Sequence, residues 1–369
     1  MFYTILFLIN KNQKTMKKFA IYALALAAMT FAACSDDDDD NKVIVTPSTS
    51  AVVLNTGNWG GNDASIMRYD ITNHTVTADL YAAANNEGLG DLAQDIIKYG
   101  SKYYVTVTGS SKLVVLDKNM KIIKTIPFMK DETPTQPRYV VGVNGKVYVT
   151  AYDGCITRID TTNFAITGTV EVGAYPEGLS YANGKLYANC SGYGAGNTVA
   201  VVDEKTFTKK KDITVLLNPY TESVVADDGN VYIVSNGNYA GSPKLAPEDY
   251  IYATVQRIDT KTDEATEVCR GTFIATYKNK LYVLYSEYYL PDTKKAFVYD
   301  LETKQELPLT DINQFSSPVG INVDPTRGDI YIFDSAWGSP ATICGPVKAD
   351  GTIANKVAAG FATVKMIFE

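Results

Sequence analysis

The chain has 369 residues, 46% of them hydrophobic and 20% charged, which is the composition of a globular protein and excludes a disordered or wholly membrane-embedded one. Its net charge of −7 argues against a nucleic-acid-binding surface, and its single histidine excludes sites that need several histidines. Tyrosine is unusually frequent, with 26 residues, which favours β-strands and amphipathic contact surfaces.

The N-terminal residues have the pattern of a secretory signal. Lys17 and Lys18 precede an apolar stretch, residues 19–31, that is too short to span a bilayer and leads into small residues. We therefore expect residues 1–33 to be a signal peptide, with Met16 as the true start.

The residues that follow the signal resemble a lipid attachment site. Phe31-Ala32-Ala33-Cys34 is similar to the lipobox of bacterial lipoproteins, although Phe31 replaces the usual leucine. An aspartate run, Asp36–Asp40, resembles the surface-export signal of Bacteroidetes-type lipoproteins. The resemblance implies lipidation of Cys34, a tether over residues 34–50, and a place on the outer membrane facing the cell exterior. The alternative is a cleaved signal followed by an acidic spacer and a free Cys34.

The remainder of the chain, residues 51–369, repeats one pattern of strands and turns. Its clearest copy begins with Asn183-Gly184-Lys185-Leu186-Tyr187, continues through a Gly-rich loop and ends its next strand with Val201-Val202-Asp203. Equivalent aspartates recur at intervals of roughly forty to fifty residues. They are Asp70, Asp117, Asp160, Asp203, Asp259, Asp300 and Asp350. Four short strands per unit at this period are typical of a β-propeller, and seven units predict seven blades.

The local chemistry of each unit favours antiparallel hairpins. Pairs such as Asn144-Gly145 supply the positive φ angles that a tight turn needs, and the aspartate that ends each third strand predicts the next turn. No window of ten or more residues has a helical stripe. Asp91–Ile97 is the one short helical candidate, and we expect it to lead into a strand.

The two ends of the repeat region predict how the ring closes. The first unit starts at its second strand, residues 51–55, and so lacks an innermost strand. Residues 361–368 have the innermost-strand pattern. We therefore predict an all-β, seven-bladed propeller of four-stranded antiparallel blades, in which the C-terminal strand completes the first blade and removes two exposed edges.

Catalytic and metal-binding patterns are missing from the sequence. There is no Gly-x-Ser-x-Gly, no His-Glu-x-x-His and no phosphate loop, and His74 lies in an expected hairpin turn. Cys155, Cys190, Cys269 and Cys344 lack metal-ligand spacing. We expect them to be small buried residues, and their pairing stays open. No catalytic residue, metal or cofactor is expected.

One face of the predicted ring is rich in aromatic residues. In a four-stranded blade, the loop between strands two and three and the crossover into the next blade emerge on the same face. Six of the seven expected loops of the first kind carry an aromatic residue. The candidate ligand-binding residues on this face are Asn58, Trp59, Asn86, Arg138, Tyr152, Tyr175, Tyr193, Tyr220, Asn236, Asn238, Tyr239, Tyr288 and Trp337. Such a collar suits a bulky amphipathic ligand.

Two questions about this collar stay open from the sequence. The tyrosines either contact a ligand or pack loop against loop. Arg138 pairs either with an anionic ligand group or with Glu177.

The repeats also carry a family resemblance. Asn183–Tyr187, Ile159-Asp160-Thr161 and Tyr175-Pro176-Glu177-Gly178-Leu179 resemble the YncE-like seven-bladed propellers over essentially the whole mature chain. With Cys34 and the aspartate run, the chain resembles the surface-lipoprotein branch that includes the BtuG-type proteins. The resemblance implies capture of cobalamin (vitamin B12) or another cobamide, hand-off to a TonB-dependent outer-membrane transporter of the BtuB type, and no enzymatic turnover.

Other functions remain compatible with the sequence. A surface glycan-binding protein would use the same aromatic residues, because tyrosine and tryptophan also stack on sugars. A propeller lactonase or lyase would need clustered acidic residues with a metal, for which Glu87, Glu177, Glu222 and Glu287 are the candidates. A purely structural interaction module is a further alternative.

Overall fold

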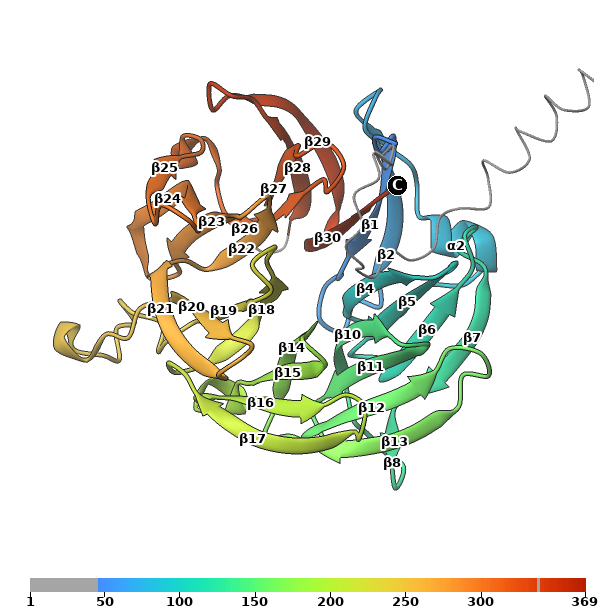
Figure 1. Ribbon diagram of the computed structural model, residues 1–369. Coiled ribbons are helices and arrows are strands. Elements are labelled where there is room, and N and C mark those ends of the chain that lie inside the picture. The colour runs from blue at the N-terminus through green and yellow to red at the C-terminus, as the bar shows by residue number, and fades with distance from the viewer. Residues whose placement is uncertain (1–45, 337–338) are drawn as a thin grey trace, which may run out of the picture. The chain divides into compact units, whose positions relative to one another are not determined.

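The computed structural model describes residues 46–336 and 339–369, and residues 46–369 form one compact unit. Seven four-stranded antiparallel sheets are arranged as a ring of blades (Figure 1). The predicted seven-bladed propeller is therefore confirmed. The signal peptide, Cys34 and the aspartate run lie outside the described residues.

The blades follow one another in chain order, and only the first uses strands from both ends of the chain. Blade 1 contains β30 (Thr363–Phe368), β1 (Ser50–Asn55), β2 (Ser65–Asp70) and β3 (Thr75–Val76). Blade 2 contains β4 (Ala93–Tyr99), β5 (Lys102–Val107), β6 (Lys112–Leu116) and β7 (Ile122–Pro127). Blade 3 contains β10 (Pro137–Val143), β11 (Lys146–Ala151), β12 (Cys155–Asp160) and β13 (Ile166–Glu171). Blade 4 contains β14 (Pro176–Ala182), β15 (Lys185–Cys190), β16 (Thr198–Asp203) and β17 (Thr208–Thr214).

The other three blades have the same order. Blade 5 contains β18 (Pro219–Val225), β19 (Val231–Ser235), β20 (Thr254–Asp259) and β21 (Glu264–Arg270). Blade 6 contains β22 (Phe273–Tyr277), β23 (Lys280–Glu287), β24 (Leu290–Asp300) and β25 (Glu306–Pro308). Blade 7 contains β26 (Pro318–Val323), β27 (Ile330–Asp334), β28 (Pro340–Val347) and β29 (Ile353–Phe361).

A few short elements interrupt the blade pattern. They are the hairpin β8 (Met129–Lys130) and β9 (Thr133–Pro134), the helix α2 (Leu80–Asn85), and the 3-10 turns η1 (Gly192–Gly194), η2 (Pro247–Asp249) and η3 (Ile312–Gln314). The sequence did not predict α2, which Asp79 caps by accepting hydrogen bonds from the backbone N–H groups of Tyr81 and Ala82. The expected strand lead at Asp91–Ile97 is confirmed, because β4 begins at Ala93. None of the helices in the described residues is long and apolar enough to cross a membrane.

The ring closes as predicted. β30 pairs antiparallel with β1, with Ala51 opposite Phe368 and Val53 opposite Met366. The backbone of Glu369 also accepts from Thr49 N at 2.7 Å and donates to Ser50 O at 2.7 Å. Because β1 and β30 pair with each other, neither strand presents an exposed edge at the point where the ring closes.

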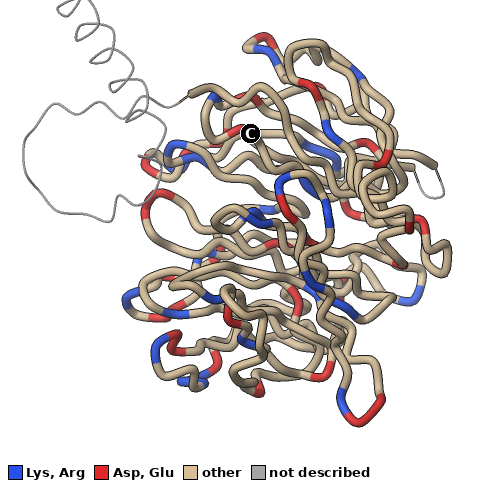
Figure 2. Tube along the Cα trace, turned by 90° about the vertical axis from the view of Figure 1, so that its right-hand side faces the viewer, with Lys and Arg blue, Asp and Glu red and all other residues tan. Residues whose placement is uncertain are grey.

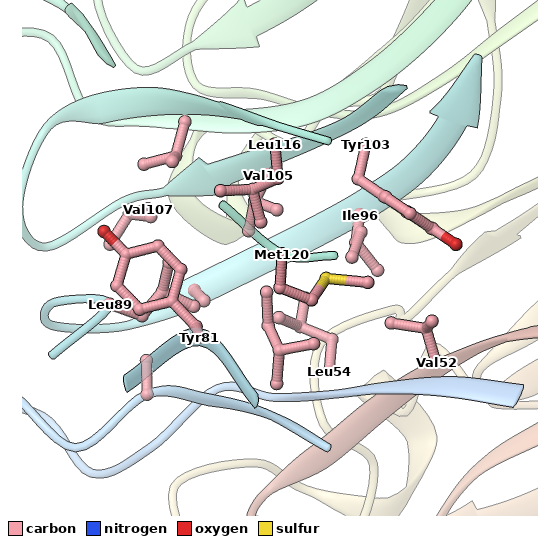
Figure 3. Close-up of a cluster of buried hydrophobic side chains, with 14 residues drawn as sticks. Val52, Leu54, Tyr81, Leu89, Ile96, Tyr103, Val105, Val107, Leu116 and Met120 are labelled. Atoms are coloured by element: carbon pink, nitrogen blue, oxygen red, sulfur yellow. The ribbon is translucent and has the colours of Figure 1, made fainter. Parts of the chain in front are cut away.

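The blades pack against one another through hydrophobic clusters. Figure 3 shows the cluster between blades 1 and 2, in which Val52 and Leu54 of β1 meet Ile96 of β4 and Val105 of β5, all fully buried. The rim of this cluster is closed by Tyr81 of α2. Each blade therefore buries its apolar side chains against a neighbour, so that the closed ring is the stable unit.

Tyrosines of the repeat also link neighbouring blades through hydrogen bonds. The hydroxyl of Tyr148 in β11 donates to Glu204 Oε1 in the turn after β16, at 2.6 Å. The hydroxyl of Tyr187 in β15 donates to Asp263 Oδ1 in the turn after β20, at 2.9 Å. Contacts between blades therefore account for part of the high tyrosine content.

The predicted turns are present. Asn144 and Gly145 have φ angles of 49° and 73°, as a tight two-residue hairpin requires. Asp160 Oδ1 accepts from Thr162 N at 2.8 Å, and this hydrogen bond contributes most to lowering the pKa of Asp160. Turns of this kind place acidic and basic residues around the ring with both signs interspersed (Figure 2).

The antiparallel order gives the ring two distinct faces. The loops between second and third strands and the crossovers into each innermost strand emerge on what we call the upper face. The other turns form the lower face. β1 is a second strand, so the chain enters the ring at the lower face, where Ser48 N donates to Thr326 Oγ1 at 2.9 Å.

Candidate functional site

The upper face carries every predicted ligand-binding residue that the structure describes. Those in loops between second and third strands are Asn58, Trp59, Tyr152, Tyr193, Asn236, Asn238, Tyr239 and Tyr288. Those in crossovers or at the start of an innermost strand are Asn86, Arg138, Tyr175 and Tyr220. Trp337 lies outside the described residues. Ligand contact by any of these side chains stays a prediction.

Three tyrosines form a continuous aromatic row over blades 3 and 4. The ring centroids of Tyr152 and Tyr175 are 5.1 Å apart, and those of Tyr175 and Tyr193 are 5.3 Å apart. Tyr175 is 39% exposed and Tyr193 is 80% exposed. We call Tyr152, Tyr175 and Tyr193 the tyrosine row. Its rings meet edge-on and tilted, and the row offers aromatic surface to solvent.

The backbone of the tyrosine row is held in an unfavourable conformation. Tyr175 and Tyr193 have φ angles of 49° and 57°, in the left-handed region that costs a residue with a side chain on the order of 1–2 kcal/mol. Buried Ser191 enforces this geometry, because its hydroxyl donates to Tyr175 O at 3.0 Å and accepts from Tyr193 N at 3.3 Å. Strain of this kind is typical of binding and catalytic loops.

A buried ion pair fixes the base of the row. Arg138 Nε lies 2.7 Å from Glu177 Oε2, and the hydroxyl of Tyr152 donates to Glu177 Oε1 at 2.6 Å. The Arg138 guanidinium also lies 4.8 Å from the centroid of the Tyr152 ring and donates to Gln94 Oε1 at 2.7 Å. The partner of Arg138, left open by the sequence, is therefore Glu177.

The charge state of this pair follows from its surroundings. Burial lowers the pKa of Arg138, but the charge and hydrogen bond of Glu177, together with Tyr152 and Tyr139, more than offset that effect, so the guanidinium stays charged. Tyr220 lies beside the pair, and burial together with the Glu177 charge raises its pKa to about 12. The hydroxyl of Tyr220 therefore stays protonated at neutral pH and can donate a hydrogen bond.

Two of the predicted asparagines are engaged within their own loops. Asn58 Nδ2 donates to Asp63 Oδ2 at 2.8 Å. Asn238 Nδ2 donates to Asp249 O at 2.8 Å, and its Oδ1 accepts from Ile251 N at 2.9 Å. These hydrogen bonds maintain the shape of the two loops. They occupy both side-chain amides and therefore do not support the expectation that the amides are available to a ligand.

The other two predicted asparagines are less constrained. Asn86 is exposed and Asn236 is half-buried. Neither side chain makes a hydrogen bond with another residue that the structure describes. Both amides are available to a ligand.

A second aromatic group lies over blades 5 and 6. Tyr288 is 82% exposed and packs edge-on against Tyr289, with centroids 4.8 Å apart. Tyr239, also at a left-handed φ of 57°, belongs to the long neighbouring loop 236–253, whose Gly241 lies directly against Tyr289. The sequence analysis did not include Tyr289 in the candidate site, because the contact between the two loops cannot be recognised from their lengths.

The aromatic residues do not form one continuous collar in the described part of the chain. Trp59 is 75% exposed and makes no ring contact with another aromatic residue there. Among the residues described, the aromatic contacts of the upper face are those of the tyrosine row, of Tyr288 with Tyr289, and of Tyr250 with Tyr252, and these groups are separate.

The candidate acidic residues of an enzyme are separately engaged. Glu87 accepts from the hydroxyl of Tyr81 at 3.0 Å, and Glu287 Oε1 accepts from Ala253 N at 2.7 Å. Glu177 belongs to the ion pair. Within residues 46–336 and 339–369, no three His, Cys, Asp or Glu side chains are arranged to hold a metal ion.

The cysteines of the described residues are free thiols. Cys190 and Cys344 are buried, as expected, whereas Cys155 and Cys269 are half-buried. Burial raises the pKa of Cys190 to about 11 and that of Cys269 to about 12, so neither forms a reactive thiolate at neutral pH. In the hairpin turn that contains it, His74 is hydrogen-bonded through Nδ1 to the hydroxyl of Tyr69 at 2.9 Å.

A central channel opens between the innermost strands. Its cavity of about 780 Å³ is lined by residues of all seven innermost strands, which surround the middle of the ring in Figure 1. Among its charged lining residues are Arg138, Asp95 and Lys365. The mouth of the channel therefore adjoins the tyrosine row through Arg138.

Comparisons with known proteins bear on the fold. The hypothetical selenium-binding protein from Sulfolobus tokodaii is 11% identical, with a TM-score of 0.63 over 88% of this chain and 94% of that one. The dihydro-heme d1 dehydrogenase NirN is 12% identical, with a TM-score of 0.56 over 93% and 78%. A streptogramin B lyase is 16% identical, with a TM-score of 0.53 over 78% and 91%. These identities show a shared fold alone.

Sequence comparison places the chain in a family. No curated protein matches it significantly. Residues 50–343 match the family model described as "Domain of unknown function (DUF5074)", which covers nearly the whole propeller. The chain is thus a member of the DUF5074 family.

Proposed function

We propose that this propeller captures a bulky amphipathic ligand on its upper face, and that the ligand is a cobamide such as cobalamin. The observation that carries the proposal is the tyrosine row beside the channel mouth, in which the exposed rings of Tyr175 and Tyr193 are held on strained backbone. The resemblance to YncE-like surface lipoproteins of the BtuG type supplies the ligand class.

The chemistry of the row fits such a ligand. A corrin ring presents a broad, partly apolar surface fringed with amide groups. Tyr175 and Tyr193 offer aromatic faces with hydroxyl tips, and such side chains bury a large area while losing few rotamers. Because the Arg138–Glu177 pair and Ser191 fix the row before ligand arrives, little ordering remains to be paid on binding.

The proposal includes anchoring and hand-off. Lipid on Cys34 would hold the chain at the outer membrane, on the exterior side. The chain enters the ring at the lower face, and the tyrosine row lies on the opposite, upper face. A TonB-dependent transporter of the BtuB type is the proposed recipient.

We also propose that the protein binds its ligand without turnover. In support, Glu177 and Glu287 are each held by a hydrogen bond within the protein and do not converge on one site. The thiols of Cys190 and Cys269 stay protonated at neutral pH, because burial raises their pKa.

The test is direct. The mature chain carrying Cys34→Ser is mixed with cyanocobalamin and separated by gel filtration with detection at visible wavelengths. Tyr175→Ala with Tyr193→Ala should weaken binding at least about tenfold, as expected for exposed aromatic contacts at the centre of a site. Ile166→Ala, which truncates a 51% exposed side chain on the outer strand β13, is the matched control and should bind normally.

Other outcomes point elsewhere. A double variant that binds as tightly as the parent would move the site away from the tyrosine row. Absence of bound colour at micromolar concentration would refute the cobamide proposal. A glycan array would then test the same row as a carbohydrate platform.

A further inference from the structure

Two carboxylates of the central channel hold equivalent positions in their blades. In each of these two blades, one residue of the innermost strand pairs with the residue that follows the repeat tyrosine. Asp95 in β4 and Glu222 in β18 each come one residue before it. That innermost-strand residue is Ile96, opposite Val105, in blade 2 and Ser223, opposite Ile233, in blade 5. The two carboxylates therefore lie at the same level of the channel, on different sides of the ring.

Both carboxylates make the same contact with the next blade. Asp95 Oδ2 accepts from Val140 N at 3.0 Å, and Glu222 Oε2 accepts from Ile274 N at 3.1 Å. Val140 and Ile274 are themselves at equivalent positions of their innermost strands. The repeat thus builds one carboxylate bridge twice.

The two bridges differ in their counter-ion. Lys365 Nζ lies 2.6 Å from Asp95 Oδ1, so that Asp95 is neutralised within the protein. Glu222 forms no ion pair within 4 Å in the described part of the chain. The charge of Lys365 also acts on Glu222 and lowers its pKa, but by less than burial raises it. Glu222 is therefore the equivalent of Asp95 without a lysine in contact with it.

The remaining charges of the channel are also neutralised. Besides the Asp95–Lys365 pair, the charged side chains that line the cavity with Glu222 are Lys98 and Arg138. Lys98 lies 2.6 Å from Glu369, and Arg138 lies 2.7 Å from Glu177. Glu222 is the one lining charge without an opposite charge beside it among the residues described.

The cavity around Glu222 has the size and lining of a small-molecule site. Its volume of about 780 Å³ lies within the range of ligand pockets, and Tyr139, Tyr220 and Phe273 contribute aromatic side chains to its wall. Aromatic faces attract organic cations. We propose that the channel is a second binding site that takes an organic ammonium ion, with Glu222 as its counter-ion.

The bound ammonium would do at Glu222 what Lys365 does at Asp95. Burial raises the pKa of Glu222 to about 7, because an ionised carboxylate without a counter-ion is costly in the channel. A ligand cation would favour the ionised form and lower that pKa. The site is independent of the tyrosine row, and its test uses no cobamide.

The experiment is isothermal titration calorimetry of the mature Cys34→Ser chain with 2-phenylethylammonium at pH 8. The neutral analogue 2-phenylethanol is titrated in parallel. We expect one ammonium per chain, bound at least about tenfold more tightly than the alcohol, because only the cation adds charge–charge attraction to its hydrogen bond with Glu222. The affinity should fall about tenfold from pH 8 to pH 6, since the ionised form of Glu222 is lost as the pH falls through its pKa.

Variants assign the effect to Glu222. Glu222→Gln is nearly isosteric and should abolish both the preference for the cation and its pH dependence. The matched control is Glu287→Gln, because Glu287 also accepts from one backbone N–H and lies outside the cavity. A third variant, Lys365→Met, leaves Asp95 in the state of Glu222 and should add a second ammonium site.

The proposal is overturned by equal affinity for the ammonium and the alcohol, or by cation binding that survives Glu222→Gln. No heat at millimolar ammonium concentration also overturns it. If Glu222→Gln does not fold, as judged by circular dichroism, the stoichiometry of Lys365→Met decides the question. One ammonium or none in that folded variant counts against the proposal.

Discussion

The Arg138–Glu177 pair allows a prediction of stability that can be worked from its contacts. Glu177 is 1% exposed and Arg138 is 6% exposed, and the carboxylate receives hydrogen bonds of 2.7 Å from Arg138 and 2.6 Å from Tyr152. Glu177→Gln keeps the shape but leaves the guanidinium buried beside a neutral amide. Breaking a buried pair in this way costs about 3–5 kcal/mol. We expect a loss of that size in the free energy of unfolding.

The same pair can be removed without the unpaired charge. Arg138→Leu combined with Glu177→Gln eliminates the buried cation, so we expect this double variant to be more stable than Glu177→Gln alone and within about 2 kcal/mol of the parent. Urea denaturation followed by tryptophan fluorescence and circular dichroism gives the free energies of unfolding of the parent, Glu177→Gln, Arg138→Leu and the double variant, which together form a double-mutant cycle. A loss below about 1 kcal/mol in Glu177→Gln would refute the reasoning, as would a double variant less stable than that single one.

Three further predictions concern the closure and packing of the ring. Glu369 should stabilise the protein at neutral pH. Burial raises its pKa, but hydrogen bonds from Lys98 and Tyr103 lower it, and the net pKa lies below the ordinary glutamate value. This stability is therefore present above the ordinary glutamate pKa and is lost as the pH falls below about 4. Glu369→Gln should therefore flatten the melting temperature against pH in that range, and an unchanged profile would contradict the assignment. Met366→Ala in the closing strand β30 removes a side chain that is 4% exposed and should cost about 2–5 kcal/mol in urea denaturation, whereas a cost under 1 kcal/mol would mean that β30 packs loosely. Gly178→Ala would place a Cβ atom 2.5 Å from the backbone oxygen of Thr221, so we expect a lower melting temperature, and a normal one would show that β14 and β18 can separate.

The fold was largely predictable because its signals are local and repeated. Turns such as Asn144-Gly145 and Asp160-Thr161 act within a few residues, and their spacing alone gave seven units. The helix α2 was missed because its six residues are too few to show a helical period. Its boundaries depend on a cap at Asp79 and not on an apolar stripe.

The site was predictable only to the level of loops. Strand order places the candidate tyrosines on one face, and the structure has them there. Which side chains are already engaged depends on neighbours distant in the sequence: Arg138 meets Glu177, 39 residues away, and Asn238 meets the far end of its own loop. Residue types in one loop carry no record of such partners.

The equivalence of Asp95 and Glu222 was hidden for a different reason. The innermost strand of blade 5 has a register shift between Pro219 and Ser223, whereas blade 2, which holds Asp95, has its shift between Ala93 and Asp95. The bulge in β18 therefore contains one residue more, and aligned sequences alone would place Glu222 at the wrong level. Only the pairing of the strands shows that the two carboxylates match.

The most direct test of the central claim is gel filtration of the mature Cys34→Ser chain with cyanocobalamin, read at visible wavelengths. We predict that the red ligand co-elutes with the protein at about one per chain and that the double variant Tyr175→Ala, Tyr193→Ala releases it. Colourless protein at micromolar concentration would contradict the proposal that the tyrosine row captures a cobamide.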